Sequence, residues 1–347
     1  MRRVPVLVTS VGGNVGQGVV KALRAARRQF RVIGIDMEPL SAGFSFVDAW
    51  YVTPRAGAPG FVERLEEICR REGVAAVYVC SHAELVFFAA ARAELEVALG
   101  ATVFVNPPQV VAIGSNKWRT VEFLRRAGLP HPDSALIDDE AGVGGLVERC
   151  GFPLVVKPCV GAAARNVFTV NSLEQLAALR QLIPGLVVQR CLPGEEAEYT
   201  AGTVSGYDGR VRAAIVLRRE LLQGTTYRAE LVDDESLTRQ VVRIVEALGA
   251  VGPCNVQFRL VDGVVCPFEI NPRFSGTSGI RYLYGFNDPE LVFALLCEGE
   301  EVGQPELRAG VVLRYWEAVH IPHATFADLR AARSVPASRV ASPALSV

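Results

Sequence analysis

The sequence predicts an α/β domain with a parallel sheet, followed by an α+β region. The first observation is a strand, a glycine-rich turn, a helix and a second strand between residues 4 and 36, which is the order of a βαβ unit. The second is a group of strands with few intervening helices from about residue 185 onward, which is typical of mixed or antiparallel sheets. The third is length: 347 residues, half of them hydrophobic, supply two or three cores.

The expected elements of the N-terminal domain alternate between strand and helix. Strands are expected at 4–9, 30–36, 75–80 and 102–105, helices at 18–28, 60–72 and 83–99, and a glycine-rich turn at 12–18. Asn106-Pro107-Pro108 ends this pattern, because prolines interrupt regular structure. We therefore expect an α/β domain over residues 1–110.

The rest of the chain mixes both kinds of element. Helices are expected at 115–127, 173–182 and 234–248, and strands at 152–158, 167–170, 185–191, 198–205 and 210–219. We divide this region into a small subdomain with a linker helix over 111–190 and a C-terminal subdomain over 191–320. Residues 321–347 are rich in Ala, Ser, Arg and Pro, and we expect a flexible tail there.

Composition narrows the classes of partner. The net charge is −1 and the two signs are interspersed, so we expect neither nucleic acid nor an anionic membrane as a partner. The eight cysteines contain no CxxC pair and lie mostly in apolar runs, which indicates buried free thiols and a cytoplasmic location. No apolar run reaches the length of a signal peptide or a membrane span. A small-molecule ligand is the expected partner.

The strongest chemical signal is a pair of oxygen donors, Glu269 and Asn271, at the end of an expected strand. Because side chains alternate along a strand, both point to one face, and Arg273 continues that face unless Pro272 turns the chain first. Two hard oxygen ligands and a fixed cation suit Mg²⁺ and phosphate oxygens. Taken alone, Glu-x-Asn also fits a plain strand end capped by a polar turn.

A hairpin centred on Asp262-Gly263 precedes this motif. A two-residue loop would place Gln257 opposite Phe268, on the wrong face for Glu269. A three-residue loop over 261–263, with Gly263 left-handed, brings Gln257 and Glu269 to one face. We predict the three-residue loop, or an equivalent bulge near Pro267.

Lysine is rare: Lys21, Lys117 and Lys157 are the only lysines among the 36 basic residues. Lys157 lies on an apolar strand, where an unpaired ammonium is costly and needs an anion. The small residues of the loop 161–167 would let backbone amides approach a polyphosphate. Lys117 follows Ser115-Asn116 at a helix start, which also favours anions. The alternative for each lysine is an ordinary surface cation in a chain biased toward arginine.

The glycine-rich turn leaves two interpretations open. Gly12-x-x-x-Gly16-x-Gly18 after a strand, with Asp36 ending the next strand, is similar to a dinucleotide fingerprint and raises the alternative of an NAD-dependent oxidoreductase. Its spacing is closer to the short-chain dehydrogenase turn, but the chain lacks a Tyr four residues before any Lys. The favoured reading is a helix N-terminus that offers amides to an anion such as a substrate carboxylate.

Ser81-x-x-Glu84 has the spacing of a capping box and predicts a helix start after the strand at 75–80. Its position at the carboxyl end of a parallel strand also makes substrate contact an option. Candidate substrate contacts are 12–14, His82 with Glu84, Arg218 or Arg219, and 277–281.

Together the two lysines, the small-residue loop and the Glu269/Asn271 motif describe a nucleotide site. At this point the chain resembles the ATP-grasp superfamily, in the branch of carbamoyl phosphate synthetase large subunits and carboxylate–amine ligases. Asn255-Val256-Gln257 and Glu269-x-Asn271-Pro272-Arg273 carry the resemblance, which covers about residues 4–318. It implies a Rossmann-like pre-ATP-grasp domain and two α+β subdomains that hold ATP between them.

The resemblance also implies a role for each matching residue. Lys117 and Lys157 would hold the ATP phosphates, under a loop that includes Gly161, Ala162 and Ala163. The adenine hinge would be Gln189, Arg190, Cys191 and Leu192, and Glu198, or else Glu196, would bind the ribose. Gln257, Glu269 and Asn271 would hold Mg²⁺, with Mn²⁺ as the alternative metal. Arg273 would act with Lys157 on the transferring phosphoryl group.

The implied activity is an ATP-dependent ligase that joins a small-molecule carboxylate to an amine or similar nucleophile. A homodimer is a further expectation. Three alternatives stay open: a non-catalytic ATP-binding regulator, the NAD-dependent oxidoreductase, and a carbamoyl phosphate synthetase itself. The last is disfavoured because the chain has one set of motifs where two synthetase halves would be required.

Overall fold

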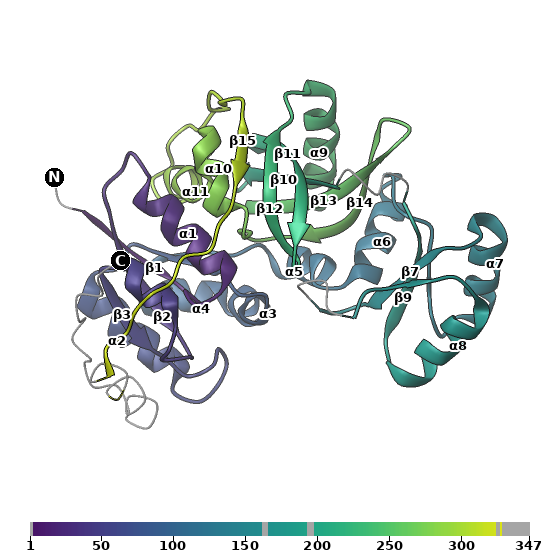
Figure 1. Cartoon of the computed structure of the whole chain (residues 1–347). Helices are drawn as coiled ribbons and strands as arrows, with labels where there is room; N and C mark the ends of the chain where they lie inside the picture. Colours follow the sequence, from purple (N-terminus) through teal and green to yellow (C-terminus); the bar gives the residue numbers. More distant parts are fainter. Residues whose placement is uncertain (1–2, 162–165, 193–197, 324–326, 328–347) are drawn as a thin grey trace.

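The computed structural model of the protein describes residues 3–161, 166–192, 198–323 and 327, and it arranges their strands in three sheets. The N-terminal sheet lies at one end of the molecule, a four-stranded sheet at the other, and a six-stranded sheet between them (Figure 1). Within the described ranges, no helix combines the length and apolarity needed to cross a membrane. The order of these sheets confirms the predicted α/β domain followed by an α+β region.

The N-terminal sheet is parallel and has the strand order β3-β2-β1-β4-β5. Its strands are β1 (Val4–Val8), β2 (Phe30–Asp36), β3 (Ala49–Val52), β4 (Ala76–Tyr78) and β5 (Thr102–Phe104). The accompanying helices are α1 (Asn14–Arg24), η1 (Ala42–Phe46), α2 (Phe61–Glu72), α3 (His82–Ala90) and α4 (Arg92–Leu99). Four of these strands agree with the sequence pattern, and the short β3 escapes it. The helix expected over 83–99 is interrupted at Ala91.

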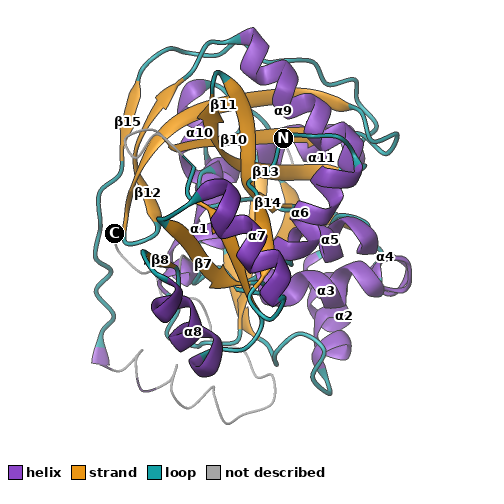
Figure 2. Cartoon of the chain, turned by 90° about the vertical axis from the view of Figure 1, so that its right-hand side faces the viewer, coloured by secondary structure: helices purple, strands orange, loops and turns teal. Residues whose placement is uncertain are grey.

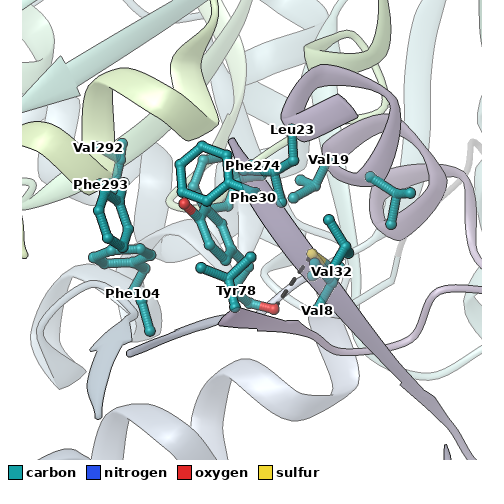
Figure 3. Packing of buried hydrophobic residues seen from close by; sticks show 14 of the residues in the cluster. Val8, Val19, Leu23, Phe30, Val32, Tyr78, Phe104, Phe274, Val292 and Phe293 are labelled. Carbon is teal, nitrogen blue, oxygen red and sulfur yellow. Dashed lines mark hydrogen bonds between the residues drawn. The ribbon is translucent and has the colours of Figure 1, made fainter. Parts of the chain in front are cut away.

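An aromatic core joins this sheet to the C-terminal part of the chain (Figure 3). Tyr78 packs edge-on against Phe104, with 4.8 Å between the ring centroids. Phe30 packs in the same way against Phe293 of α11 (Asp288–Leu296), with 5.2 Å between the centroids. All four rings are buried, so this contact holds α11 against the N-terminal sheet.

Helix α1 begins at Asn14, which corrects the prediction of a turn over 12–18 and a helix from residue 18. A Cβ on Gly16 would lie 2.3 Å from the carbonyl oxygen of Ser10, and one on Gly18 would lie 3.0 Å from the backbone nitrogen of Gly279. These two glycines therefore allow close packing of the helix. The sequence pattern could not separate this use of glycine from its use in turns.

Replacement of Gly16 by alanine is expected to lower the free energy of unfolding by roughly 1–3 kcal/mol, because the added methyl group has no space against the Ser10 carbonyl. The matched control is Gly144→Ala in α7 (Glu140–Cys150), an exposed helical glycine with no atom within 4 Å of the added Cβ. That change is expected to stabilise the protein by about 0.5–1 kcal/mol. Urea denaturation of both variants measures the difference, and equal effects would contradict the packing argument.

The four-stranded sheet is antiparallel and has the order β6-β9-β7-β8. Its strands are β6 (Ser134–Leu136), β7 (Leu154–Pro158), β8 (Phe168–Val170) and β9 (Leu186–Arg190). Helices α7 and α8 (Leu173–Leu182) cover one face of this sheet (Figure 2). Leu154 and Val156 pack onto this face in a cluster that includes Leu146 and Leu176 of the two helices. Because side chains alternate along β7, Val155 and Lys157 point to the opposite face. Helices α5 (Pro108–Gly114) and α6 (Lys117–Arg126) connect this sheet to the N-terminal domain.

The six-stranded sheet has the order β14-β13-β10-β11-β12-β15. Its strands are β10 (Glu198–Ser205), β11 (Val211–Leu222), β12 (Thr225–Leu231), β13 (Gly252–Val261), β14 (Val264–Asn271) and β15 (Val311–Leu313). Helix α9 (Glu235–Leu248) buries one face through contacts with Val256, Phe258 and Ile270. Two short helices, α10 (Ser278–Arg281) and η2 (Tyr282–Tyr284), follow β14. The face away from α9 carries the polar residues of the predicted site.

The β13–β14 hairpin combines a two-residue turn with a bulge. Val261 pairs with Val264, and Asp262 and Gly263 between them have φ angles of 52° and 77°. Both residues are therefore left-handed, as in the tight turns that match strand twist, and the predicted three-residue loop was wrong. The predicted alternative, a bulge near Pro267, is confirmed, because Phe258 pairs with Pro267 whereas Gln257 pairs with Glu269. Gln257 and Glu269 consequently share one face.

Candidate nucleotide-binding site

A cavity of about 400 Å³ lies between the four-stranded and six-stranded sheets. Strands β7 and β9 line it from one side, and β10, β11, β13 and β14 line it from the other. Among the residues that sequence analysis selected, it brings together Lys117, Lys157, Gly161, Gln189, Arg190, Cys191, Leu192, Glu198, Gln257 and Glu269. Ala162, Ala163 and Glu196 lie outside the described residues.

One wall of the cavity is the end of β9 and the residues that follow it. Gln189 is buried and turns its Nε2 toward Ser134 Oγ, to which it donates at 2.9 Å. The Arg190 amide donates to the Asp133 carbonyl oxygen at 2.8 Å, which continues the sheet toward β6. Cys191 and Leu192 follow as irregular backbone along the cavity. This wall therefore presents the chain from Gln189 to Leu192 to the cavity.

Lys157 projects from β7 into the cavity and is only 6% exposed. Its Nζ donates to the Phe268 carbonyl oxygen at 3.3 Å and lies 5.5 Å from the centroid of the Phe268 ring. Burial lowers the pKa of Lys157 to about 8; the Glu269 carboxylate opposes this shift, whereas Lys117 adds to it. The interpretation as a surface cation does not apply to this residue. An anionic ligand would restore the solvation that burial removes.

Lys117 is the first residue of α6, which the Asn116 side chain caps by accepting from the amides of Trp118 and Arg119. Its Nζ donates to the Gly161 carbonyl oxygen at 2.9 Å, at the start of the small-residue loop. The two lysines thus approach one cavity from different elements.

Glu198 pairs with an arginine that sequence analysis had not connected to it. It stands opposite Arg219 across β10 and β11, and its Oε1 accepts from Arg219 Nε at 3.0 Å and also from Nη2. Arg219 is buried and lines the cavity, whereas Arg218, the alternative substrate contact, is exposed. The pairing depends on strand register, which no local sequence pattern reveals.

The predicted metal ligands lie side by side on β13 and β14. Gln257 stands opposite Glu269, and both line the cavity. Asn271 Nδ2 donates to Glu269 Oε1 at 2.9 Å, and Asn271 Oδ1 accepts from Arg273 Nη2 at 2.9 Å. In the described ranges, no group of three or more His, Cys, Asp or Glu side chains forms a metal cage. One carboxylate and two amide oxygens fit Mg²⁺, which takes one or two carboxylates and completes its shell with phosphates and water.

Arg273 follows the predicted metal ligands in the chain, and two hydrogen bonds hold its guanidinium. Besides Asn271, it donates through Nη1 to the Phe274 carbonyl oxygen at 2.8 Å. Burial lowers its pKa, but guanidinium stays charged in proteins. A Cβ on Gly114 of α5 would lie 2.3 Å from Pro272 Cδ, so α5 packs tightly beneath the turn that aims Arg273. Asn106, read from the sequence only as a domain end, also fixes this turn by donating to the Pro272 carbonyl oxygen at 3.0 Å.

The predicted capping box is confirmed. Ser81 Oγ accepts from the Ala83 amide, and Glu84 Oε2 accepts from the Ser81 amide. Glu84 also accepts from Thr9 Oγ1 at 2.6 Å and from Ser10 Oγ at 3.0 Å, and burial raises its pKa. Internal partners therefore account for Glu84 without a ligand.

Two other candidate contacts of the sequence analysis are engaged internally. Asp36 accepts from the Gly12 amide at 2.7 Å and from the Glu38 amide at 2.9 Å, so each of its oxygens already has an internal hydrogen-bond partner. Arg281, within the candidate range 277–281, is 1% exposed and pairs with Asp288. It is therefore too deeply buried to contact a substrate, which corrects that prediction for this residue. His82 is half-buried, and its pKa is lowered first by burial and then by Arg273 and Lys117.

Comparison with known proteins bears on the family and the fold of the chain. A family model described as "ATP-grasp in the biosynthetic pathway with Ter operon" matches residues 183–319, and one described as "PylC-like, N-terminal domain" matches residues 6–104. The chain is similar to the carbamoyl phosphate synthase large chain of Thermomicrobium roseum, with 28% identity over 287 residues that cover 76% of this chain and 26% of the relative. The chain thus spans about a quarter of that relative.

Two further similar proteins have lengths closer to this chain. The D-alanine–D-alanine ligase of Laribacter hongkongensis is 26% identical over 206 residues, which cover 54% of this chain and 65% of that protein. The structure of N5-carboxyaminoimidazole synthetase from Staphylococcus aureus complexed with ADP superposes with a TM-score of 0.69 and 13% identity, covering 91% of this chain and 83% of that one. At that identity the likeness establishes the fold alone.

The two matches include the parallel N-terminal sheet and the six-stranded sheet that carries Gln257, Glu269 and Asn271. They agree with the resemblance inferred from the residues alone. The chain belongs to the ATP-grasp superfamily.

Proposed function

We propose that this ATP-grasp protein is an ATP- and Mg²⁺-dependent ligase that activates a small-molecule carboxylate as an acyl phosphate and transfers the acyl group to an amine. The observation that carries the proposal is the meeting of Lys157 from one sheet with Gln257 and Glu269 from the other at a single cavity. A cation opposite oxygen donors is what a metal–triphosphate complex requires. The proposed subdomains, 111–190 and 191–320, would hold the nucleotide between them.

In this proposal the adenine lies against residues 189–192, where backbone groups and the apolar side chains of Val155 and Phe268 line the cavity. Glu198 binds the ribose hydroxyls, because both hydrogen bonds from Arg219 go to its Oε1 and leave Oε2 outside this pair. Lys117 and Lys157 bind the phosphates. Burial of Lys157 supports this assignment, because its ammonium lacks a carboxylate within hydrogen-bonding distance among the described residues.

Gln257, Glu269 and Asn271 would hold the metal, and Mg²⁺ or Mn²⁺ bound there would neutralise charge on the phosphate oxygens. Arg273 reaches the same row through Asn271, and it provides a permanent cation for the transferring phosphoryl group. These residues contribute positioning and charge, which is most of what phosphoryl transfer demands of a protein.

The reaction proceeds in two steps. A carboxylate oxygen attacks the γ-phosphorus, the bond to the β–γ bridging oxygen breaks, and ADP leaves. The amine nitrogen then attacks the acyl carbon, the bond to the phosphate oxygen breaks, inorganic phosphate leaves and the nitrogen loses a proton. No nucleophilic protein side chain is needed in either step, which agrees with a cavity built from lysines, carboxylates and amides.

A phosphate-release screen over a matrix of carboxylates and amines with MgATP is expected to reveal at least one pair that raises turnover above the ATP-only rate. Omission of either partner identifies which compound is activated and which is the nucleophile. A thermal shift with ATP but no stimulated release across the matrix would support the ATP-binding regulator instead. Stabilisation by NADH and not by ATP would support the oxidoreductase.

A further inference from the structure

Arg281 is the largest of the fully buried side chains in the described part of the protein, and it does not line the nucleotide cavity. Its Nη1 donates to Asp288 Oδ2 at 3.0 Å, and its Nη2 donates to Asn255 Oδ1. Both members of the ion pair are 1% exposed. The guanidinium is thus anchored at one end by a carboxylate and presents its other end to an amide of β13.

The six-stranded sheet leaves space for this guanidinium. Gly202 stands opposite Asn255 across β10 and β13, and a Cβ on Gly202 would lie 2.2 Å from Arg281 Cζ. A glycine inside a strand weakens the strand, and it often marks a place where another group approaches closely. At this position the approaching group is Arg281.

Asn255 lies between Arg281 and Asn271, one of the proposed metal ligands. Its Oδ1 accepts from Thr200 Oγ1 at 2.9 Å as well as from Arg281, so two donors fix the orientation of the carboxamide. Asn255 also stands directly opposite Asn271 across β13 and β14. Opposed side chains in an antiparallel pair are close neighbours, with Cβ atoms about 4.5–5.5 Å apart. The orientation of Asn255 therefore limits the conformations open to Asn271.

Stability alone does not account for this cluster. Removing an ion pair from water is costly, and apolar residues of similar volume often serve equally well or better. In the described structure, Arg281 Nε and Asp288 Oδ1 are buried without a hydrogen-bond partner, as is unusual for a pair that serves only to stabilise. The chain retains the pair and the accommodating Gly202 in spite of these costs.

We propose that Arg281 is a positioning residue for the metal site. Anchored by Asp288, it orients Asn255, which sets the conformation of the Asn271 ligand across the strand pair. This inference rests on the proposed assignment of Gln257, Glu269 and Asn271 to Mg²⁺. Arg281 acts through Asn255 and touches neither nucleotide nor metal.

The test compares nucleotide binding with and without Mg²⁺ by calorimetry, on the full chain. The main variant is the double replacement Arg281→Met with Asp288→Leu, which removes both charges and leaves neither buried alone. Affinity for metal-free ATP is expected to stay at the wild-type value. The gain in affinity on adding Mg²⁺ is expected to fall about tenfold or more, as is typical when a group that orients a metal ligand is lost.

Thr200→Val removes the other donor to Asn255, and it is expected to reduce the Mg²⁺ gain in the same direction. This single change tests the inference even if the double variant folds poorly. The matched control is Tyr284→Phe, which removes a buried hydroxyl that donates to the Ala229 carbonyl oxygen at 2.7 Å and accepts from the Val312 amide at 3.2 Å. It is expected to lower the melting temperature without changing the Mg²⁺ gain.

An unchanged Mg²⁺ gain in the double variant and in Thr200→Val would overturn the inference, and so would an equal loss in Tyr284→Phe. Those results would leave the proposed function intact. Failure of the wild-type protein to bind ATP more tightly with Mg²⁺ would instead refute the proposed metal site, and with it the premise of the inference.

Discussion

Glu269→Ala is expected to abolish MgATP turnover, with kcat lowered by about 10²–10³-fold or more, while the protein stays folded. Glu269 is the one carboxylate in the predicted metal set, and it also accepts from Asn271. Because its charge raises the pKa of Lys157, the variant is expected to weaken the proposed phosphate-binding cation as well as the proposed metal site. ADP formation with the substrate pair found by the screen measures the effect, and circular dichroism confirms the fold.

The matched control for this variant is Glu220→Ala, which removes an exposed carboxylate of β11 that pairs with Arg228. Exposed ion pairs contribute little to stability, and Glu220 does not line the cavity. Turnover is expected to match the wild type. Wild-type rates of ADP formation in Glu269→Ala would refute the assignment of this row to the metal.

Lys157→Met is the second variant with a large expected effect, a loss of ATP turnover by about 10²–10³-fold. The change removes the cation from the cavity but keeps most of the side-chain volume, so the four-stranded sheet is expected to stay intact. Lys21→Met provides the control, since Lys21 is an exposed lysine on α1 far in sequence from the cavity residues. If Lys157→Met turned over ATP like the wild type, the phosphate-binding role would be wrong.

Lys157 is also expected to make both stability and ATP affinity depend on pH, with opposite signs. In the nucleotide-free protein burial lowers its pKa to about 8, below the ordinary lysine value of 10.5 that applies to an unfolded chain. Between these values the unfolded chain binds more protons than the folded one, so the contribution of Lys157 to stability rises with pH across this window. ATP affinity is expected to fall over the same window, because phosphate binding requires the ammonium. Both trends are measured as the difference between the wild type and Lys157→Met.

The fold could be predicted where a regular pattern extends over a whole element. Strands β1, β2 and β10 and helices α8 and α9 follow from hydrophobic periodicity and their flanking residues. Helix α7 escapes that logic because Gly142, Gly144 and Gly145 lower its intrinsic propensity, and it is stabilised instead by the Asp139 cap and the packing of Leu146. Strand β6 is three residues long, too short for a period to be seen.

The candidate site could be predicted where residue type alone is informative. Rare lysines and closely spaced oxygen donors selected Lys157 and Glu269 without knowledge of the tertiary structure. The Glu198–Arg219 pair and the Asn255–Arg281 contact were not found, because each joins residues that only strand register or a later helix brings together. The length of the hairpin loop was predicted wrongly for the same reason, since it also depends on strand register. Long-range pairing, and not local propensity, sets these contacts.

Phe268 is the bulged residue of β14, because the residues on either side of it pair with β13 and Phe268 does not. If Phe268 were absent, Pro267 would still face Phe258 and the next residue, Glu269, would still face Gln257. Gln257 would therefore pair with Glu269 in a strand that lacked Phe268 as well. What would be lost is the carbonyl group and the ring that Lys157 contacts. The additional residue in the strand therefore supplies a carbonyl acceptor and an aromatic face to the buried ammonium of Lys157, the proposed phosphate-binding cation.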